Sequence, residues 1–310
     1  MSTEYEEEAP KRTQVYRELG QGLKILHDPS RADIDIVAVP GLGTNPIQCW
    51  TWEESTKDHA RRTKSTNAAG DASLSPSAAT IPDAPRTFNW LKDADGLHSL
   101  FPTARIMLYD YASAWTGKRR VRATMRSICT WLLDDLTERR KNGTEITRPL
   151  IMIGHSMGGV VIAKTLCVAR ARREYEAVVT CTMGCLFFGA PFKGSEMAKV
   201  ALLYSSVFGS DAYESLLSFM RTEKNDTLDE VTNDFMEISG KLAPPIELIC
   251  AYEQVPTDVD YAERFMGSPK MNGLLQHKFF RPGAKKILEV GVSMLPGTVS
   301  ITASAPNTII

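Results

Sequence analysis

Short apolar runs recur along this chain, and the segments between them repeat their apolar residues at helical spacing. The runs predict β-strands at residues 34–39, 104–111, 149–154, 185–189, 246–253 and 285–292. One intervening segment, residues 121–140, places apolar residues three and four positions apart and predicts an amphipathic helix. Because strands and helices alternate, the pattern predicts an α/β fold with a doubly wound, mostly parallel sheet between helices.

Three segments depart from this alternation. Residues 1–31 are polar and charged and predict a disordered or extended N-terminal arm, so the folded domain is expected to span residues 32–310. Residues 54–86 are rich in Ser, Ala and Pro and predict a disordered surface insertion. Residues 196–240 have a mainly helical pattern and fall where a helical cap would be inserted over a ligand site.

A buried strand, a tight turn and a helix follow one another at residues 149–161. The turn reads Gly154-His155-Ser156-Met157-Gly158, which is the Gly-x-Ser-x-Gly pattern of a nucleophile elbow. A side chain at position 154 or 158 would collide with the neighbouring strand or helix, and the strained turn aims the serine hydroxyl out of the sheet. The helix that follows directs its positive N-terminal end at the same point. Ser156 is therefore the candidate nucleophile.

A glycine-containing loop, Pro40-Gly41-Leu42-Gly43, follows the strand at residues 34–39. Glycine permits backbone N–H groups to approach a substrate oxygen closely, as an oxyanion hole requires, whereas an ordinary β-to-α turn is the alternative interpretation. The carboxyl ends of parallel strands meet at one edge of a sheet, where ligands bind. We therefore expect Ser156, this loop, Pro191 and Glu253 to converge at that edge.

The composition and net charge of the chain argue against several classes of function. The chain has 310 residues and a net charge of −1, which argues against a general role in binding nucleic acid. Its six cysteines lack Cys-x-x-Cys spacing, so neither disulfides nor a metal site is expected, and no cofactor is implied. The acidic N-terminus has no signal-peptide core and no run approaches the roughly 20 apolar residues of a membrane span, so a cytoplasmic location is expected. The basic stretch at 118–122 is either a solvated helix face or a peripheral contact with anionic lipid headgroups.

Several motifs together resemble a known family. They are Val-Pro-Gly-Leu-Gly at 39–43, Trp50, Trp90-Leu91, Gly-His-Ser-Met-Gly-Gly at 154–159, Phe-Phe-Gly-Ala-Pro at 187–191 with Gly194-Ser195, and Tyr252-Glu253. The set resembles the α/β-hydrolase serine esterase domains that are common in fungi and often stand at the N-terminus of signalling proteins with a NACHT module and repeats. It is also similar to serine-active-site lipase-like proteins and to GPI-inositol deacylases.

The resemblance implies a role for each motif residue. Ser156 would be the nucleophile, and the N–H groups of Leu42 and Met157 would form the oxyanion hole. Glu253 would orient the catalytic histidine, with Asp258 and Asp260 as alternatives for the acid. The order serine, acid, histidine along the chain is that of α/β-hydrolases.

The catalytic histidine is absent from the place where the resemblance implies it. Residues 295–301 match the approach to that segment, but no histidine follows them before Ile310. Of the five histidines, His277 alone follows Glu253, and it is either a surface residue or a displaced base. The sequence thus predicts an active enzyme that uses His277 or another partner, an impaired esterase-like domain, or a chain whose C-terminal end is truncated.

The expected function is that of a serine hydrolase which cleaves carboxyl esters, of the esterase or lipase type, through an acyl-enzyme on Ser156. The substrate would be a small ester or a lipid, and no nucleic acid is expected as a partner. The alternative is a catalytically impaired, esterase-like domain that serves as a signalling or interaction module.

Overall fold

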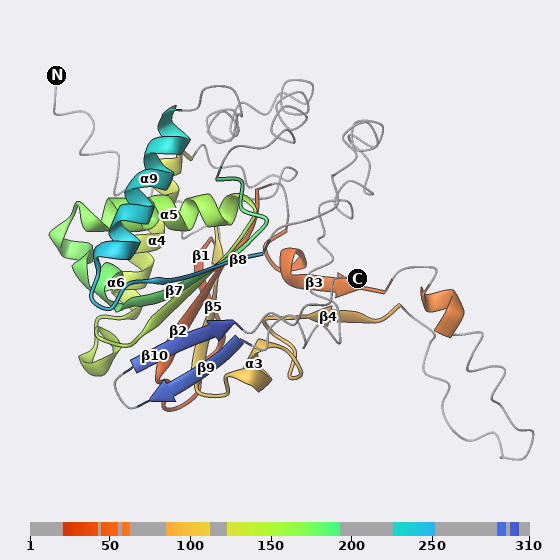
Figure 1. The fold of residues 1–310 in the computed structure, drawn as a ribbon. Coiled ribbons are helices and arrows are strands. Elements are labelled where there is room, and N and C mark those ends of the chain that lie inside the picture. Colours follow the sequence, from red (N-terminus) through yellow and green to blue (C-terminus); the bar gives the residue numbers. More distant parts are fainter. Residues whose placement is uncertain are drawn as a thin grey trace, which may run out of the picture.

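A six-stranded sheet forms the centre of the computed structural model, which describes residues 21–42, 45–54, 58–62, 85–111, 123–192, 226–251, 290–295 and 298–303 (Figure 1). The strand order is β1-β5-β2-β6-β7-β8. The bounds are Gly22–His27 for β1, Ile34–Val39 for β2, Ala104–Asp110 for β5, Leu150–His155 for β6, Thr182–Phe188 for β7 and Glu247–Ala251 for β8. Only β1 is antiparallel to its neighbour, and the other pairs are parallel. The predicted mostly parallel sheet is therefore confirmed.

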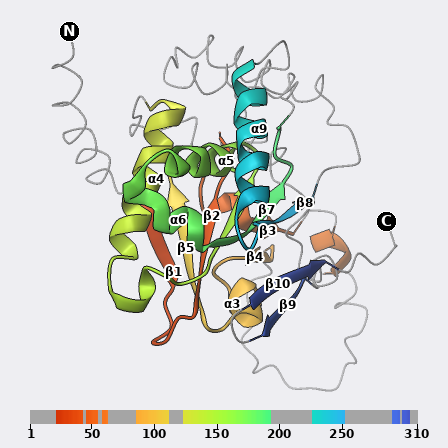
Figure 2. The ribbon, with the colours of Figure 1, turned by 60° about the vertical axis from the view of Figure 1, so that its left-hand side comes forward.

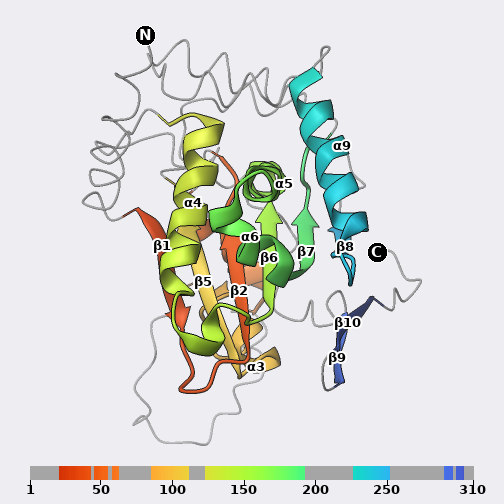
Figure 3. The same ribbon diagram turned by 90° about the vertical axis from the view of Figure 1, so that its left-hand side faces the viewer.

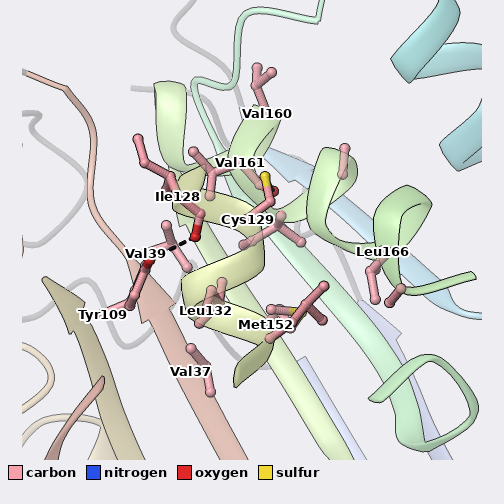
Figure 4. Close-up of a cluster of buried hydrophobic side chains, with 14 of the residues drawn as sticks. Val37, Val39, Tyr109, Ile128, Cys129, Leu132, Met152, Val160, Val161 and Leu166 are labelled. Carbon is pink, nitrogen blue, oxygen red and sulfur yellow. Dashed lines mark hydrogen bonds between the residues drawn. The ribbon is translucent and has the colours of Figure 1, made fainter. Parts of the chain in front are cut away.

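Both faces of the sheet are buried, because successive residues of each strand point to opposite sides and both sets are apolar. In β2, Ile34 and Ile36 belong to one core cluster, whereas Val37 and Val39 belong to the other. Figure 4 shows the second cluster, in which side chains of β2 and β6 meet those of α4 and α5.

Helices cover the two faces unequally. The helices α4 (Met125–Arg139), α5 (Met157–Arg170), α6 (Glu176–Cys181) and α9 (Asp226–Lys241) gather on one side, as Figures 2 and 3 show. The other face is covered by the 3-10 turn η1 (Gln48–Trp50), the hairpin of β3 (Thr51–Glu53) and β4 (Thr87–Asn89), and the short helix α3 (Leu97–Leu100). Two further 3-10 turns, η2 (Gly143–Glu145) and η3 (Arg173–Tyr175), connect elements on the first side.

The start of the folded domain differs from the sequence prediction. Residues 22–27, which were expected to belong to an N-terminal arm, form β1 and pair with β5 from Gly22 opposite Asp110 onward. The strand is an edge strand with only two of its six residues buried, so its polar residues conceal it in the sequence. Residues 1–20 lie outside the described residues.

Two predicted insertions are described in part. Within residues 54–86, residues 58–62 are helical, and Arg62 binds Glu54 through two hydrogen bonds. Residues 63–84 lie outside the described residues. Within the predicted cap at 196–240, residues 226–240 belong to α9, which packs against α5 with Leu228, Val231 and Phe235 buried. The rest of that segment lies outside the described residues.

The last predicted strand does not join the central sheet. Residues 290–295 form β9 (Val290–Leu295), which pairs antiparallel with β10 (Thr298–Ala303) in a separate two-stranded ribbon. The expectation that the strand at 285–292 joins the parallel sheet is thus wrong for residues 290–292, and residues 285–289 lie outside the described residues. A six-residue apolar run fits a hairpin as well as a buried parallel strand, so the sequence pattern does not separate the two.

A buried cluster of charged side chains lies at the end of the sheet where β2 begins. The carboxylate of Asp35, which is 0% exposed, accepts hydrogen bonds from three arginines, Arg105, Arg140 and Arg148. Arg105 also donates to Glu145. Each charge is paired inside the protein, which is the condition under which a buried charge is tolerated.

Candidate active site

Ser156 occupies a strained turn between β6 and α5. Its backbone has φ 51° and ψ −126°, and it is the one non-glycine residue with a positive φ in the described part of the chain. The Ser156 N–H donates to the carbonyl of Phe188 at 2.8 Å, and the Ser156 carbonyl accepts from the N–H of Gly159 at 3.0 Å. These two bonds hold the strained conformation between β7 and the first turn of α5.

The elbow glycines are required by close backbone contacts. A Cβ atom on Gly154 would lie 2.6 Å from the Cα of Gly159 in α5. A Cβ atom on Gly158 would lie 2.1 Å from the carbonyl oxygen of Val39, at the end of β2. Real Cβ atoms do not approach so closely, and this confirms the predicted reason for both glycines.

The loop after β2 lies directly against the elbow. A Cβ atom on Gly41 would lie 3.1 Å from the Cβ of Ser156 and 3.1 Å from Nδ1 of His155. The carbonyl of Pro40 accepts a 2.8 Å hydrogen bond from the hydroxyl of Tyr111, a buried residue that follows β5. The ends of β2, β5 and β6 therefore meet around Ser156.

The two predicted oxyanion donors belong to these meeting segments. Leu42 and Met157 are 8% and 1% exposed, and both side chains belong to the core cluster that contains α4 and α5. Met157 is the first residue of α5. The N–H groups of a first helical turn have no acceptor within the helix, and they form its positive pole. The arrangement can thus stabilise negative charge next to Ser156.

His155 is buried on the opposite face of the sheet from α5. Its Nδ1 lies 3.1 Å from Sγ of Cys49, and its ring meets Trp50 edge-on at a centroid distance of 6.2 Å. The side chain is 2% exposed. His155 therefore points away from its neighbour Ser156, and its contacts are those of a supporting residue.

The predicted acid and base lie outside the described residues. Glu253, its alternatives Asp258 and Asp260, and His277 all fall within residues 252–289. The strand that leads to Glu253 is described as far as Ala251, whose carbonyl accepts a 2.8 Å hydrogen bond from the N–H of Gly189. Since Gly189 directly follows β7, the described end of β8 lies at the same edge of the sheet as Ser156.

The other described histidines have different surroundings. The ring of His59 binds Glu54, and His27 and His98 lie against each other with ring centroids 3.9 Å apart. No hydrogen bond joins a described histidine to the hydroxyl of Ser156.

Two further expectations concern metal ligands and membrane-spanning helices among the described residues. Among those residues, no group of three or more metal-ligating side chains is found. Within the same ranges, no helix has the length and apolar character that a membrane span requires. The basic stretch at 118–122, the basis for a peripheral membrane contact, lies outside the described residues.

Tyr111, Cys49 and the contacts of Gly41 are features of this site that sequence reasoning missed. Tyr109 and Tyr111 lie two residues apart and therefore share a face of the sheet. This spacing was the one signal in the sequence that Tyr111 is buried on that face. Nothing in the sequence indicates that the hydroxyl reaches a loop 71 positions away.

The strand order and the elbow define the class of this protein as an α/β-hydrolase fold. A serine at a sharp strand-to-helix turn, at the carboxyl edge of a mostly parallel sheet, is the defining local feature of that fold. No family model matches the chain.

Curated relatives match part of the chain. Protein SERAC1 of Bos taurus is 25% identical over 138 residues, which are 44% of this chain and 20% of the relative. Protein SERAC1 of Danio rerio is 29% identical over 104 residues, which are 33% of this chain and 16% of the relative. The matched stretch thus spans about a fifth or less of these relatives.

Solved structures with a similar arrangement include hydrolases. The lipase BlEst2 of Bacillus licheniformis has a TM-score of 0.40 at 13% identity, over 74% of this chain and 70% of the lipase. The NocB thioesterase domain, solved as a covalent complex with a fluorophosphonate nocardicin G analogue, has a TM-score of 0.35 at 13% identity, over 81% of this chain and 84% of that domain.

Proposed function

We propose that this protein is a serine hydrolase that cleaves carboxyl esters through an acyl-enzyme on Ser156. The observation that carries the proposal is the strained backbone of Ser156, at φ 51°, with Gly41 packed against its Cβ and α5 beginning at the next residue. Strain of this kind costs on the order of 1–3 kcal/mol, and it is typical of residues whose position serves catalysis.

In the proposed reaction, Oγ of Ser156 attacks the ester carbonyl while a base takes its proton. The N–H groups of Leu42 and Met157 stabilise the negative charge that develops on the carbonyl oxygen. The base returns the proton to the departing alcohol, and water then attacks the acyl-enzyme by the reverse sequence of proton transfers. We assign the base to His277 and its orienting carboxylate to Glu253, in the chain order of α/β-hydrolases.

We further propose that the acyl group of the substrate is apolar, as in a lipid or a small hydrophobic ester. Three aromatic rings lie together beyond the elbow: Phe187 meets Phe192 at 5.0 Å and Phe235 at 5.8 Å between centroids. Phe192 is half-buried, and the chain next to it contacts the elbow, since a Cβ on Gly159 would lie 2.5 Å from the Cβ of Ala190. Phe187 and Phe235 are each 2% exposed and belong to the core, so Phe192 is the ring of the three that a substrate can reach. An aromatic ring at that position favours a hydrocarbon chain over a charged group.

A second candidate function is an esterase-like module that binds its ligand or partner without hydrolysis. It differs from the first candidate in whether a base reaches Ser156. Without a base the serine hydroxyl remains a weak nucleophile, and loss of a triad member typically lowers turnover by about 10⁴- to 10⁶-fold.

The experiment that tests the proposal uses the full chain with a fluorophosphonate probe and short-chain nitrophenyl esters. Wild type should be labelled on Ser156 and hydrolyse the esters, and Ser156→Ala should lose both properties. Ser99→Ala is the matched control, because that hydroxyl lies in α3 and donates to the carbonyl of Gly96. Loss of turnover in His277→Ala, with its thermal unfolding unchanged, would support the assigned base. The absence of any Ser156-dependent labelling would favour the binding module.

A further inference from the structure

The loop that carries the proposed oxyanion donor Leu42 begins with a proline and a glycine. Pro40 has a fixed φ, whereas Gly41 has wide conformational freedom. The orientation of the peptide between these residues therefore depends on what binds its carbonyl oxygen. The hydroxyl of Tyr111 donates to that oxygen, and Gly158 lies next to it, since a Cβ atom on Gly158 would lie 2.6 Å away.

The hydrogen bond from Tyr111 is well placed to fix that peptide. It is 2.8 Å long, and Tyr111 is only 2% exposed, so water does not compete with the hydroxyl. The carbonyl and N–H of a planar trans peptide point in opposite directions. A hydroxyl that holds the carbonyl of Pro40 therefore also sets the direction of the Gly41 N–H and fixes the point from which the chain continues into Leu42.

A second tyrosine, two residues earlier and within β5, provides a comparison. Tyr109 is also buried, and its hydroxyl also donates to a backbone carbonyl, that of Ile128 in α4, at 2.7 Å (Figure 4). The two rings lie on the same face of the sheet with centroids 5.8 Å apart. They differ in what they hold, because Tyr109 binds a helix of the core and Tyr111 binds the loop against Ser156.

We infer that Tyr111 is a positioning residue, whose hydroxyl holds the Pro40–Gly41 peptide so that the N–H of Leu42 faces the oxygen of a substrate carbonyl bound at Ser156. The catalytic part of this inference rests on the proposed hydrolase function, whereas the effect on the loop does not. The role is distinct from that of the nucleophile, the acid and the base, since Tyr111 acts only through the loop.

The test compares Tyr111→Phe with Tyr109→Phe in the full chain. Both substitutions remove one buried phenol hydroxyl from a backbone carbonyl and keep the ring, so they lose the same kind of bond. Hydrogen–deuterium exchange read on the peptide that contains residues 40–42 should accelerate in Tyr111→Phe, by about 10-fold or more, and remain at the wild-type rate in Tyr109→Phe. This readout requires no enzymatic activity.

The catalytic readout is turnover of a nitrophenyl ester with kcat and KM measured separately. Misplacement of an oxyanion donor weakens binding of the transition state more than that of the substrate, so Tyr111→Phe should lower kcat by roughly 10- to 100-fold at nearly unchanged KM. Tyr109→Phe should stay within about twofold of wild type.

The outcomes separate this inference from the proposed function. Equal exchange of residues 40–42 in the two variants would overturn the positioning role, whatever the activity. Faster exchange in Tyr111→Phe with wild-type kcat would overturn the link to the oxyanion donor. If wild type shows no Ser156-dependent turnover or labelling, the proposed function fails and with it the catalytic part of this inference, while the exchange measurement still decides whether Tyr111 holds the loop.

Discussion

Gly158 of α5 is in direct backbone contact with Val39 at the end of β2. A Cβ atom on Gly158 would lie 2.1 Å from the carbonyl oxygen of Val39 and 2.6 Å from that of Pro40. The contact joins the elbow, which presents Ser156, to the loop that contains Leu42. The relative position of these two segments therefore depends on the absence of a side chain at one residue.

We expect Gly158→Ala to disturb the site, because the added methyl group would clash with backbone atoms, which cannot move aside as a flexible side chain can. The substitution should lower the free energy of unfolding by about 1–3 kcal/mol and lower Ser156-dependent turnover by about 10²-fold. Urea unfolding and labelling by a fluorophosphonate probe measure the two effects.

Gly240→Ala is the matched control for that variant. Gly240 lies in α9, and a Cβ atom there would meet nothing within 4 Å. Alanine in a helix should raise stability by about 0.5–1 kcal/mol, through the smaller conformational entropy of the unfolded chain. A Gly158→Ala variant as stable and as reactive as Gly240→Ala would show that the contact between α5 and β2 is dispensable.

Asp35→Asn should destabilise the fold strongly, because it removes the one carboxylate that Arg105, Arg140 and Arg148 share. Burial on its own lowers the pKa of Arg105, but its hydrogen bond and ion pair with Asp35 raise that pKa above its ordinary value. Breaking a buried pair from one side typically costs about 3–5 kcal/mol. The free energy of unfolding in urea measures the loss.

The exposed pair of Glu237 and Lys241 on α9 provides the comparison. Their side chains are 62% and 74% exposed, so solvent screens the pair and Glu237→Gln should change stability little. Similar losses for Asp35→Asn and Glu237→Gln would mean that water or rearranged side chains replace Asp35.

The central strands could be predicted because each is an apolar run long enough to cross a sheet that is buried on both faces. β2 shows the limiting case, since all six of its residues are buried. β1 could not be recognised in this way, because it pairs along only one edge and Lys24 is exposed within it. The ribbon of β9 and β10 could not be predicted for a different reason, because an apolar run does not indicate which strand it pairs with.

The site could be predicted as far as its chemistry is encoded locally. Ser156 and the elbow glycines form one continuous motif, and their geometry follows from steric rules for glycine and for left-handed backbone. The contacts of Tyr111 with Pro40 and of Cys49 with His155 join residues 71 and 106 positions apart. Such contacts depend on strand order and register, which the local pattern does not contain.

The cysteines should react with thiol reagents in an order set by burial. Burial raises the pKa of Cys129 to about 12 and also raises that of Cys185, and both residues are 0% exposed. The thiolate is the reactive form, so at pH 8 we expect both to react at least about 100-fold more slowly than in the unfolded chain. Cys250, which is exposed on the edge strand β8, should be modified before them.

Iodoacetamide labelling followed by peptide mass spectrometry measures this order. In urea, where the fold is lost, the three thiols should react at similar rates, which is the internal control. Rapid labelling of Cys129 or Cys185 in the folded protein would contradict the packing of α4 and β7.

Acid sensitivity should depend on Glu54, which joins the two ends of the segment between β3 and β4. Its carboxylate accepts hydrogen bonds from the side chain of Arg62 and from the backbone N–H of Arg86. The bond with Arg62, helped by those with Arg86 and His59, lowers the pKa of Glu54 from 4.5 to about 2. Because the pKa is lower in the folded state, this contribution to stability is complete above pH 4.5 and is lost as the pH falls through about 2.

Glu54→Gln should therefore unfold with a weaker pH dependence than wild type across that window, and should be less stable than wild type at pH 7. The measurement is urea unfolding at a series of pH values from 7 down to 2.5, with thermal unfolding at the same values as a second readout. Glu53→Gln, at the neighbouring exposed position in β3, should keep the wild-type dependence. If Glu54→Gln and wild type lose stability in parallel as acid is added, then Glu54 does not hold its interactions with Arg62 and Arg86 in solution, and the acid sensitivity of the fold arises from other carboxylates.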